Sequence, residues 1–143
     1  MQVHLAILLF GIVTAVHAQS SCPWMNAATA GGLLGGQVTA KFSPDGKHGG
    51  KCEFVRSPNS DASVRIEVTV MESPKTQFSH YVAECGANGK PVKAIGNEAV
   101  ACSSGNEQSV VGRVRDQAFV VTLVPARRDG VKKAADIVAG NLF

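Results

Sequence analysis

The chain has 143 residues and a mass of 14.9 kDa, which excludes a large multidomain enzyme. With 45% hydrophobic and 17% charged residues, the composition is that of a chain that folds. The formal net charge of +3 is modest. Composition therefore indicates one small globular domain and does not by itself indicate a function.

Residues 1–18 are typical of a secretory signal peptide. An apolar run over residues 5–16 ends in Val16-His17-Ala18, which fits the small-x-small cleavage rule. Cleavage after Ala18 leaves residues 19–143 as a single domain. We expect no stable membrane insertion, because a run of about a dozen apolar residues is shorter than the roughly 20 that cross a bilayer. Gln19-Ser20-Ser21 lacks the aliphatic residue and the Gly or Ala that precede the cysteine of a lipoprotein signal, so lipidation of Cys22 is not expected.

The four cysteines all lie after the predicted cleavage site. Successive cysteines are 30, 33 and 17 residues apart, whereas zinc sites usually contain pairs two to four residues apart. An even number of exported cysteines indicates disulfides in an oxidising, secreted or periplasmic environment. Three connectivities are possible, and the order of predicted elements favours two bonds that each join a helix to a strand of its own half. These bonds are Cys22 with Cys52 and Cys85 with Cys102.

A short helix is predicted first in the mature chain. Asn26 is placed to cap a helix that runs to Leu34, and Gly35-Gly36 provides a left-handed ending. Trp24 is interpreted as a cap over this helix and its disulfide, whereas an exposed tryptophan here would be a binding anchor.

Three strands are predicted next. Residues 37–42 and 51–56 flank the turn residues Pro44-Asp45-Gly46. Residues 63–71 give the clearest strand, because apolar and polar residues alternate with a period of two. We expect the apolar face of this strand to be covered by the helix that follows.

A second helix is predicted to open at Ser73-Pro74, an N-cap followed by proline at the first helical position. An apolar stripe on it places a cysteine on the core side. The stripe consists of Phe78, Tyr81, Val82 and Cys85.

The last part of the chain is predicted to form strands and a closing helix. Residues 94–102 are interpreted as a loop that enters a strand, and residues 109–114 and 118–124 as an antiparallel hairpin. The second hairpin strand is apolar on both faces, so we expect it to be central. Asp129 is predicted to cap a C-terminal helix, whose buried stripe is Val131, Ala135, Val138 and Leu142.

This order of elements predicts an α+β fold. An antiparallel β-sheet with helices packed on one face would form a two-layer sandwich. The order also suggests two helix-plus-meander pseudo-repeats, closed by the last helix.

Few residues have the spacing of a catalytic or metal site. His80 and Glu84 are four apart on the predicted second helix and could hold a metal with His48, but a solvent-exposed pair is the favoured interpretation. Ser103-Ser104-Gly105 lacks the frame of a nucleophilic serine. We therefore predict no catalytic residues, no metal and no cofactor.

The region of residues 113–133 is basic. Six cations and two acids, Asp116 and Asp129, give it a local charge of +4. Such a region could bind an anionic ligand, an envelope polymer or an acidic partner, and a solvated face is the alternative. No aromatic residues are interleaved as in single-strand nucleic-acid sites, so nucleic acid is not an expected partner. The candidate binding residues are Arg113, Arg115, Arg127, Arg128, Lys132 and Lys133, together with Trp24.

Several short motifs together resemble a known family. They are Cys22 with a small-residue helix ending in Leu33-Leu34-Gly35-Gly36, then Cys52-Glu53-Phe54, and Ile95-Gly96-Asn97-Glu98-Ala99. This pattern resembles uncharacterised bacterial cell-envelope proteins, often lipoproteins, that are similar to the extracellular sensor domain of bacterial Ser/Thr kinases. The resemblance implies a two-layer α+β fold, a Cys22–Cys52 disulfide and a ligand-binding or sensing role. The chain departs from the pattern because it lacks a lipoprotein signal and any kinase or transmembrane segment.

The leading functional hypothesis is therefore a monomeric, non-enzymatic binding or sensor-like module, secreted or periplasmic, with a small ligand as its partner. A second hypothesis is a protein–protein interaction or inhibitor-like protein that presents a sheet face or edge to an envelope protein. The third is a small metal-assisted hydrolase that uses His48, His80 and Glu84.

Overall fold

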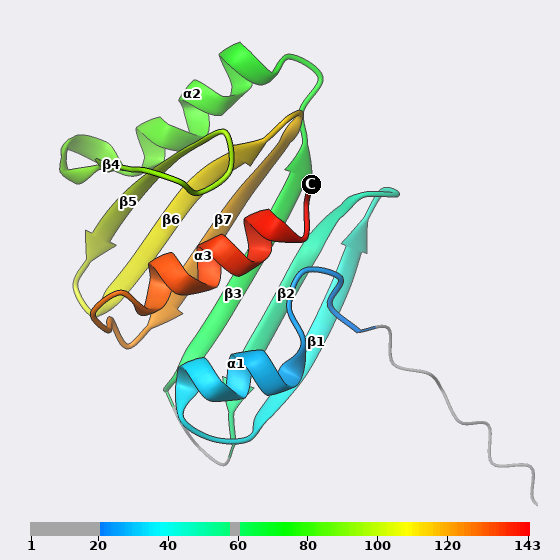
Figure 1. The fold of residues 1–143 in the computed structure, drawn as a ribbon, viewed down its shortest axis with the longest axis vertical. Coiled ribbons are helices and arrows are strands. Elements are labelled where there is room, and N and C mark those ends of the chain that lie inside the picture. The colour runs from blue at the N-terminus through cyan, green and yellow to red at the C-terminus, as the bar shows by residue number, and fades with distance from the viewer. Residues whose placement is uncertain (1–20, 58–60) are drawn as a thin grey trace, which may run out of the picture.

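A computed structural model describes residues 21–57 and 61–143. The predicted signal peptide and the middle of the predicted turn at 57–61 lie outside the described residues. Within them, one antiparallel sheet of seven strands has the order β1-β2-β3-β7-β6-β5-β4 (Figure 1). The strands are β1 (Val38–Asp45), β2 (Gly49–Arg56), β3 (Ser63–Val70), β4 (Lys90–Val92), β5 (Glu98–Ser104), β6 (Glu107–Val114) and β7 (Gln117–Val124). The helices are α1 (Ala27–Leu34), α2 (Pro74–Glu84), α3 (Gly130–Gly140) and the short 3-10 helix η1 (Gly86–Asn88).

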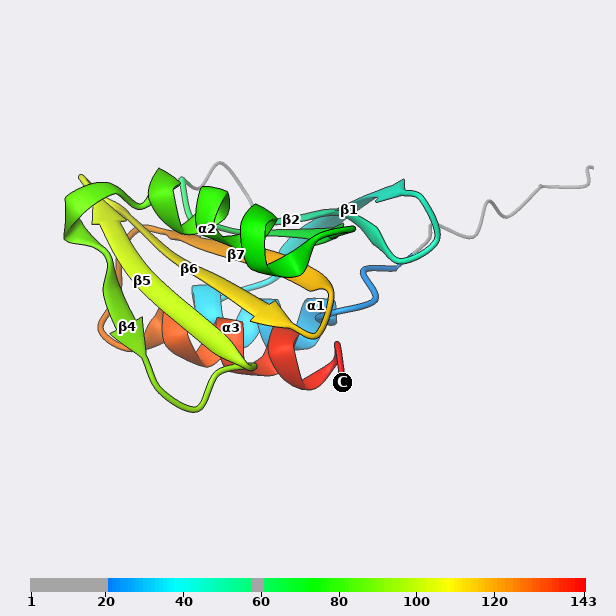
Figure 2. The ribbon, with the colours of Figure 1, turned by 90° about the horizontal axis from the view of Figure 1, so that it is seen from above.

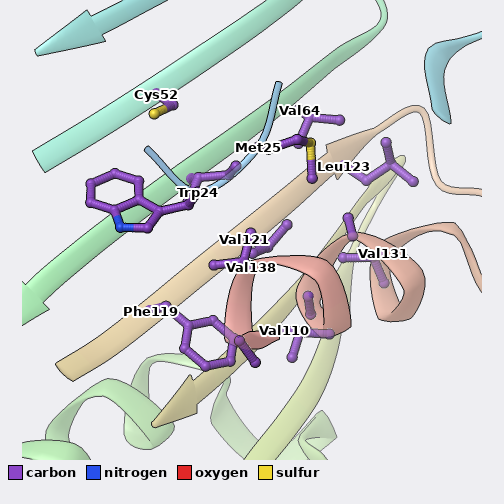
Figure 3. Packing of buried hydrophobic residues seen from close by; sticks show 14 of the residues in the cluster. Trp24, Met25, Cys52, Val64, Val110, Phe119, Val121, Leu123, Val131 and Val138 are labelled. Atoms are coloured by element: carbon purple, nitrogen blue, oxygen red, sulfur yellow. The ribbon is translucent and has the colours of Figure 1, made fainter. Parts of the chain in front are cut away.

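The main core lies between the sheet and a layer formed by α1 and α3. Both helices lie on the same face of the sheet, as Figure 2 shows from above. Figure 3 shows buried side chains of α3 and the sheet directed into the space between them, among them Val138 and Phe119. The predicted α+β class is thus observed, and the sheet with the α1–α3 layer forms the expected two layers, but the expectation that all helices pack on one face is wrong for α2. The buried stripe of α3 is the one expected from the sequence.

Helix α2 lies on the opposite face of the sheet (Figure 2). Its Phe78 packs in a second cluster with Met71, Val111 and Ala118. The apolar face of β3, which we expected α2 to cover, packs instead in the core that contains α1 and α3. The reason is that β7 is apolar on both faces and Val111 of β6 adds to its second face, so this surface is buried under α2, whereas the second face of β3 carries Arg65 and Glu67.

The helices begin where the sequence predicts, but the expected cap of α3 is not formed: Asp129 lies at the N-cap position and its side chain makes no capping hydrogen bond. The Oδ1 atom of Asn26 accepts a hydrogen bond from the Thr29 N–H at 2.8 Å, and Gly35 ends α1 with a φ of 76°. Helix α2 begins at Pro74, as expected, although the Ser73 side chain makes no capping bond. Instead the Ser73 N–H donates to the Gln77 side chain at 2.9 Å.

The two halves of the sheet are arranged symmetrically, but the helices are not. Strands β1-β2-β3 and β7-β6-β5 form mirrored runs that meet where β3 pairs with β7, so β7 is central, as predicted. Helices α1 and α2 lie on opposite faces, so the two predicted units differ in where their helix packs. Strand β4 was not predicted, because three residues that include Pro91 carry almost no periodic signal.

Both predicted disulfides are present, and no described cysteine is free. The Cys22–Cys52 bond ties the segment before α1 to β2, where Cys52 is only 2% exposed. The Cys85–Cys102 bond ties the end of α2 to β5 on the other face of the sheet. No helix among the described residues is long and apolar enough to cross a membrane.

Candidate functional site

A groove lies between the start of α3 and the β4 edge of the sheet. Helix α3 packs mainly against β6 and β7, and the sheet continues past it through β5 to β4 (Figure 1). The volume of this space, which we call the β4–α3 groove, is about 850 Å³. Its lining comprises Ala87, Asn88, Gly89, Lys90, Pro91, Val92, Ala101, Cys102, Ser103, Gln108, Arg128, Asp129, Val131 and Lys132.

The register of the sheet explains which side chains meet in the groove. Lys90 pairs with Ala101, and Ser103 pairs with Gln108. Because side chains alternate between faces along a strand, these four residues lie on the α3 face of the sheet. Arg128, Asp129 and Lys132 come from the connection after β7 and the first turn of α3.

The groove is cationic. Lys90, Arg128 and Lys132 are all exposed, and none of them has an ion pair within residues 21–57 and 61–143. Asp129 is the one acidic residue in the lining, so the lining carries a formal charge of +2. Three cations without partners on one concave surface attract an anion from solution.

The side chain of Gln108 is part of the groove lining. Its Oε1 atom is buried beneath the surface and has no hydrogen-bond partner among the described residues, so it reaches a ligand only after the amide turns. An unpaired buried acceptor costs on the order of 1–3 kcal/mol. This side chain is therefore a group that gains from a new hydrogen-bond donor.

The Cys85–Cys102 disulfide lies on the other face of the sheet, next to one rim of the groove. Cys102 is part of the lining, and Cys85 immediately precedes η1, whose Ala87 and Asn88 also line the groove. The bond therefore ties the segment that forms this rim to β5 from the opposite face of the sheet.

The structure places the six basic candidates of the sequence at two opposite ends of β7. Arg113 and Arg115 lie at the β6–β7 turn, and the other four lie after β7 or in α3. Strand β7 has eight residues, so the two groups are separated by about 25 Å. The six residues therefore do not form one patch, and Arg128 and Lys132 line the groove.

Two of these arginines support the fold. The Nε atom of Arg113 donates to Glu98 at 3.3 Å, and its Nη1 atom donates to the Arg115 carbonyl at 2.8 Å. Arg127 donates to the carbonyls of Leu33 and Leu34 at 3.3 and 3.5 Å. These carbonyls lie at the end of α1, where the helix leaves its last acceptors without internal partners.

Trp24 lies in the core and is 5% exposed. Its ring lies 5.8 Å from that of Phe42 in an edge-to-face arrangement, and its carbonyl accepts from the Asn141 side chain at 3.0 Å. This burial favours the interpretation of Trp24 as a cap of the core over that of a surface anchor.

The described residues contain no group of three or more His, Cys, Asp or Glu side chains that could hold a metal. His48 lies in the turn between β1 and β2, and His80 and Glu84 lie on α2. All three are exposed.

A second hollow lies on the face of β1, β2 and β3 that also bears α2. It has a volume of about 310 Å³ and a charged lining that includes Lys41, Lys51, Glu53, Arg65 and Glu67. Lys51 lies 3.7 Å from Glu67, and Arg65 lies 3.0 Å from Glu107. Because ion pairs engage Lys51 and Arg65, this face has the pattern of a solvated sheet surface.

No protein-family model matches the chain, and no curated protein matches its sequence. The chemistry of the groove lining is therefore what bears on function.

Three of the lining residues, Lys90, Ser103 and Gln108, were not candidates in the sequence. The alternation of Lys90 and Val92 around Pro91 is the one local signal for β4. Three residues are too few for such an alternation to predict a strand.

Proposed function

We propose that this protein is an exported binding module, secreted or periplasmic and without catalytic activity, that holds a small ligand in the β4–α3 groove. The observation that carries the proposal is a groove of about 850 Å³ lined by three unpaired cations of the described chain. Small-molecule sites typically have volumes of roughly 300–1,000 Å³ and a few polar groups that orient the ligand.

The two disulfides support export as part of this proposal. Paired cysteines are typical of secreted and periplasmic proteins, because cytosolic thiols are kept reduced. The predicted cleavage after Ala18 and the resemblance to envelope sensor domains favour the same compartment.

The proposal is tested with protein secreted to the periplasm and purified with its disulfides intact. A thermal-shift screen against a library of charged and neutral metabolites identifies ligands, and calorimetry measures their affinities. We expect ligands whose binding is abolished by Ser103→Trp, because the indole fills the groove from its floor. Ser104→Trp is the matched control, since the next residue of β5 points to the opposite face.

Two results would reject the proposal. One is a screen without any stabilising ligand, or with ligands that the Ser103→Trp variant binds as well as the parent. The other is turnover of a substrate that is lost on substitution of His80 or Glu84, which would favour the metal-assisted hydrolase instead.

A further inference from the structure

We infer that the ligand of the β4–α3 groove is a small hydroxylated anion, a molecule with a phosphate or carboxylate group beside hydroxyl groups. This inference rests on the proposed function, because it names the ligand class of the same groove. Two separate observations support it, one for the anionic part and one for the hydroxyl groups.

The anionic group of the proposed ligand is inferred from the partners of the lysine and arginine side chains. Elsewhere Lys51, Arg65 and Arg113 pair with glutamates, and Arg127 binds carbonyls of α1. Because these cations already have carboxylate or carbonyl partners, binding a further anion would add little favourable free energy.

The groove cations differ from these in two ways. Lys90, Arg128 and Lys132 have no acidic partner in the described part of the chain, a property they share with other surface cations such as Lys133, and in addition all three line one concave surface. Arg128 can offer two parallel N–H donors to a phosphate or carboxylate, and the two lysines add point charges. A ligand anion would thus be bound by three groups without breaking an existing ion pair.

The hydroxyl part follows from Gln108 and Ser103, which pair across β5 and β6 and both line the groove. The Oε1 atom of Gln108 has no donor among the described residues. The terminal torsion of a glutamine is soft, so the amide can turn its oxygen toward a ligand hydroxyl. No aromatic ring is among the described lining residues, so hydrogen bonds and charge are the interactions that this groove offers.

The test uses four probes on the disulfide-bonded protein, measured by calorimetry at low salt and at about 0.3 M salt. They are glucose 6-phosphate, galacturonate, glucose and inorganic phosphate. We expect saturable binding of at least one of the two hydroxylated anions, weaker binding of inorganic phosphate and no binding of glucose. Affinity should fall with salt, because the groove charges are exposed and therefore screened. Preference for glucose 6-phosphate or for galacturonate distinguishes a phosphorylated from a carboxylated ligand.

Matched variants connect the binding to named residues. Lys132→Gln should weaken binding of the preferred probe about tenfold, which corresponds to about 1.4 kcal/mol. Lys133→Gln removes the same charge from the next residue of α3, which does not line the groove, and should leave the affinity unchanged. Gln108→Leu should reduce the preference for the hydroxylated anion over inorganic phosphate, since the apolar side chain cannot receive a hydroxyl donor.

The outcomes separate this inference from the proposed function. If glucose or other neutral ligands bind in a manner sensitive to Ser103→Trp and insensitive to Lys132→Gln, the groove is a binding site but its ligand is not an anion. If neither hydroxylated anion binds at millimolar concentration, the inference is wrong whatever the wider screen finds. Equal effects of Lys132→Gln and Lys133→Gln would show attraction by overall charge and would also overturn it.

Discussion

The ring of Phe119 in β7 lies over Gly112 of β6, where the Cβ atom of any other residue would stand. The two residues pair in register, and both are buried in the middle of the sheet. The missing side chain of Gly112 thus provides the space in which the ring packs.

Gly112→Ala should destabilise the protein by about 1–3 kcal/mol, because a methyl group would overlap the ring in a closely packed core. The measurement is the urea midpoint of unfolding. Gly32→Ala is the control, since Gly32 is exposed in α1 with open space around it and should gain up to about 1 kcal/mol from the better helix former. An unchanged midpoint for Gly112→Ala would contradict the observed packing of Phe119.

Asn26→Ala should cost about 1 kcal/mol, because it removes the side-chain oxygen that caps the first turn of α1. Chemical denaturation measures the loss. Asn26→Ser should recover most of it, since a serine can accept the same hydrogen bond. Equal stability of the alanine and serine variants would show that the cap contributes nothing.

Two adjacent arginines should have separable effects. Arg127→Gln should lower stability by less than about 1 kcal/mol and leave groove binding unchanged, because it removes hydrogen bonds to α1 at an exposed site. Arg128→Gln should leave stability within about 0.5 kcal/mol of the parent and weaken binding of the anionic probe. Denaturation and calorimetry on both variants test this. The reverse pattern would place the binding site away from the groove.

Each disulfide should stabilise the protein by an amount that rises with the logarithm of the loop length it closes. The cysteines are 30 residues apart in Cys22–Cys52 and 17 apart in Cys85–Cys102, so replacing either pair by alanine should cost about 3–4 kcal/mol, with the loss about 0.5 kcal/mol larger for Cys22–Cys52. Urea denaturation of the two double variants measures these losses. A larger loss from the Cys85–Cys102 pair would contradict the loop argument.

Only one of these disulfides should affect ligand binding. Replacing Cys85 and Cys102 by alanine should weaken binding of the anionic probe, because this bond anchors the groove rim to β5. Replacing Cys22 and Cys52 should leave the affinity of the folded protein unchanged, since that bond joins β2 to the segment before α1. Calorimetry at a temperature where both variants are folded tests the difference.

The first helix shows how much of the fold could be read from neighbouring residues. Asn26, Leu34 and Gly35 fixed its start, length and end, because capping depends on groups within a turn of one another. The alternation in β3 and the proline at the start of α2 are local signals of the same kind. The disulfide pairing followed from this order of elements, since each bond joins neighbouring parts of one half.

The face on which α2 packs could not be read in this way. Its stripe indicated that one side is buried, but β3 and the β6–β7 pair both offered an apolar surface. The choice depended on α1 and α3 together filling the first face, which is a property of the assembled sheet.

The sequence by itself thus determined the α+β class, the helix ends, the main strands and the paired cysteines, because these depend on contacts within a few turns or between adjacent elements. The tertiary structure decided that Lys90, Gln108 and Lys132 share one groove while Arg115 lies at the other end of β7. The physical reason is that α3 covers β6 and β7 only, while the sheet continues past the helix to β4. The part of the sheet that α3 leaves uncovered forms the groove.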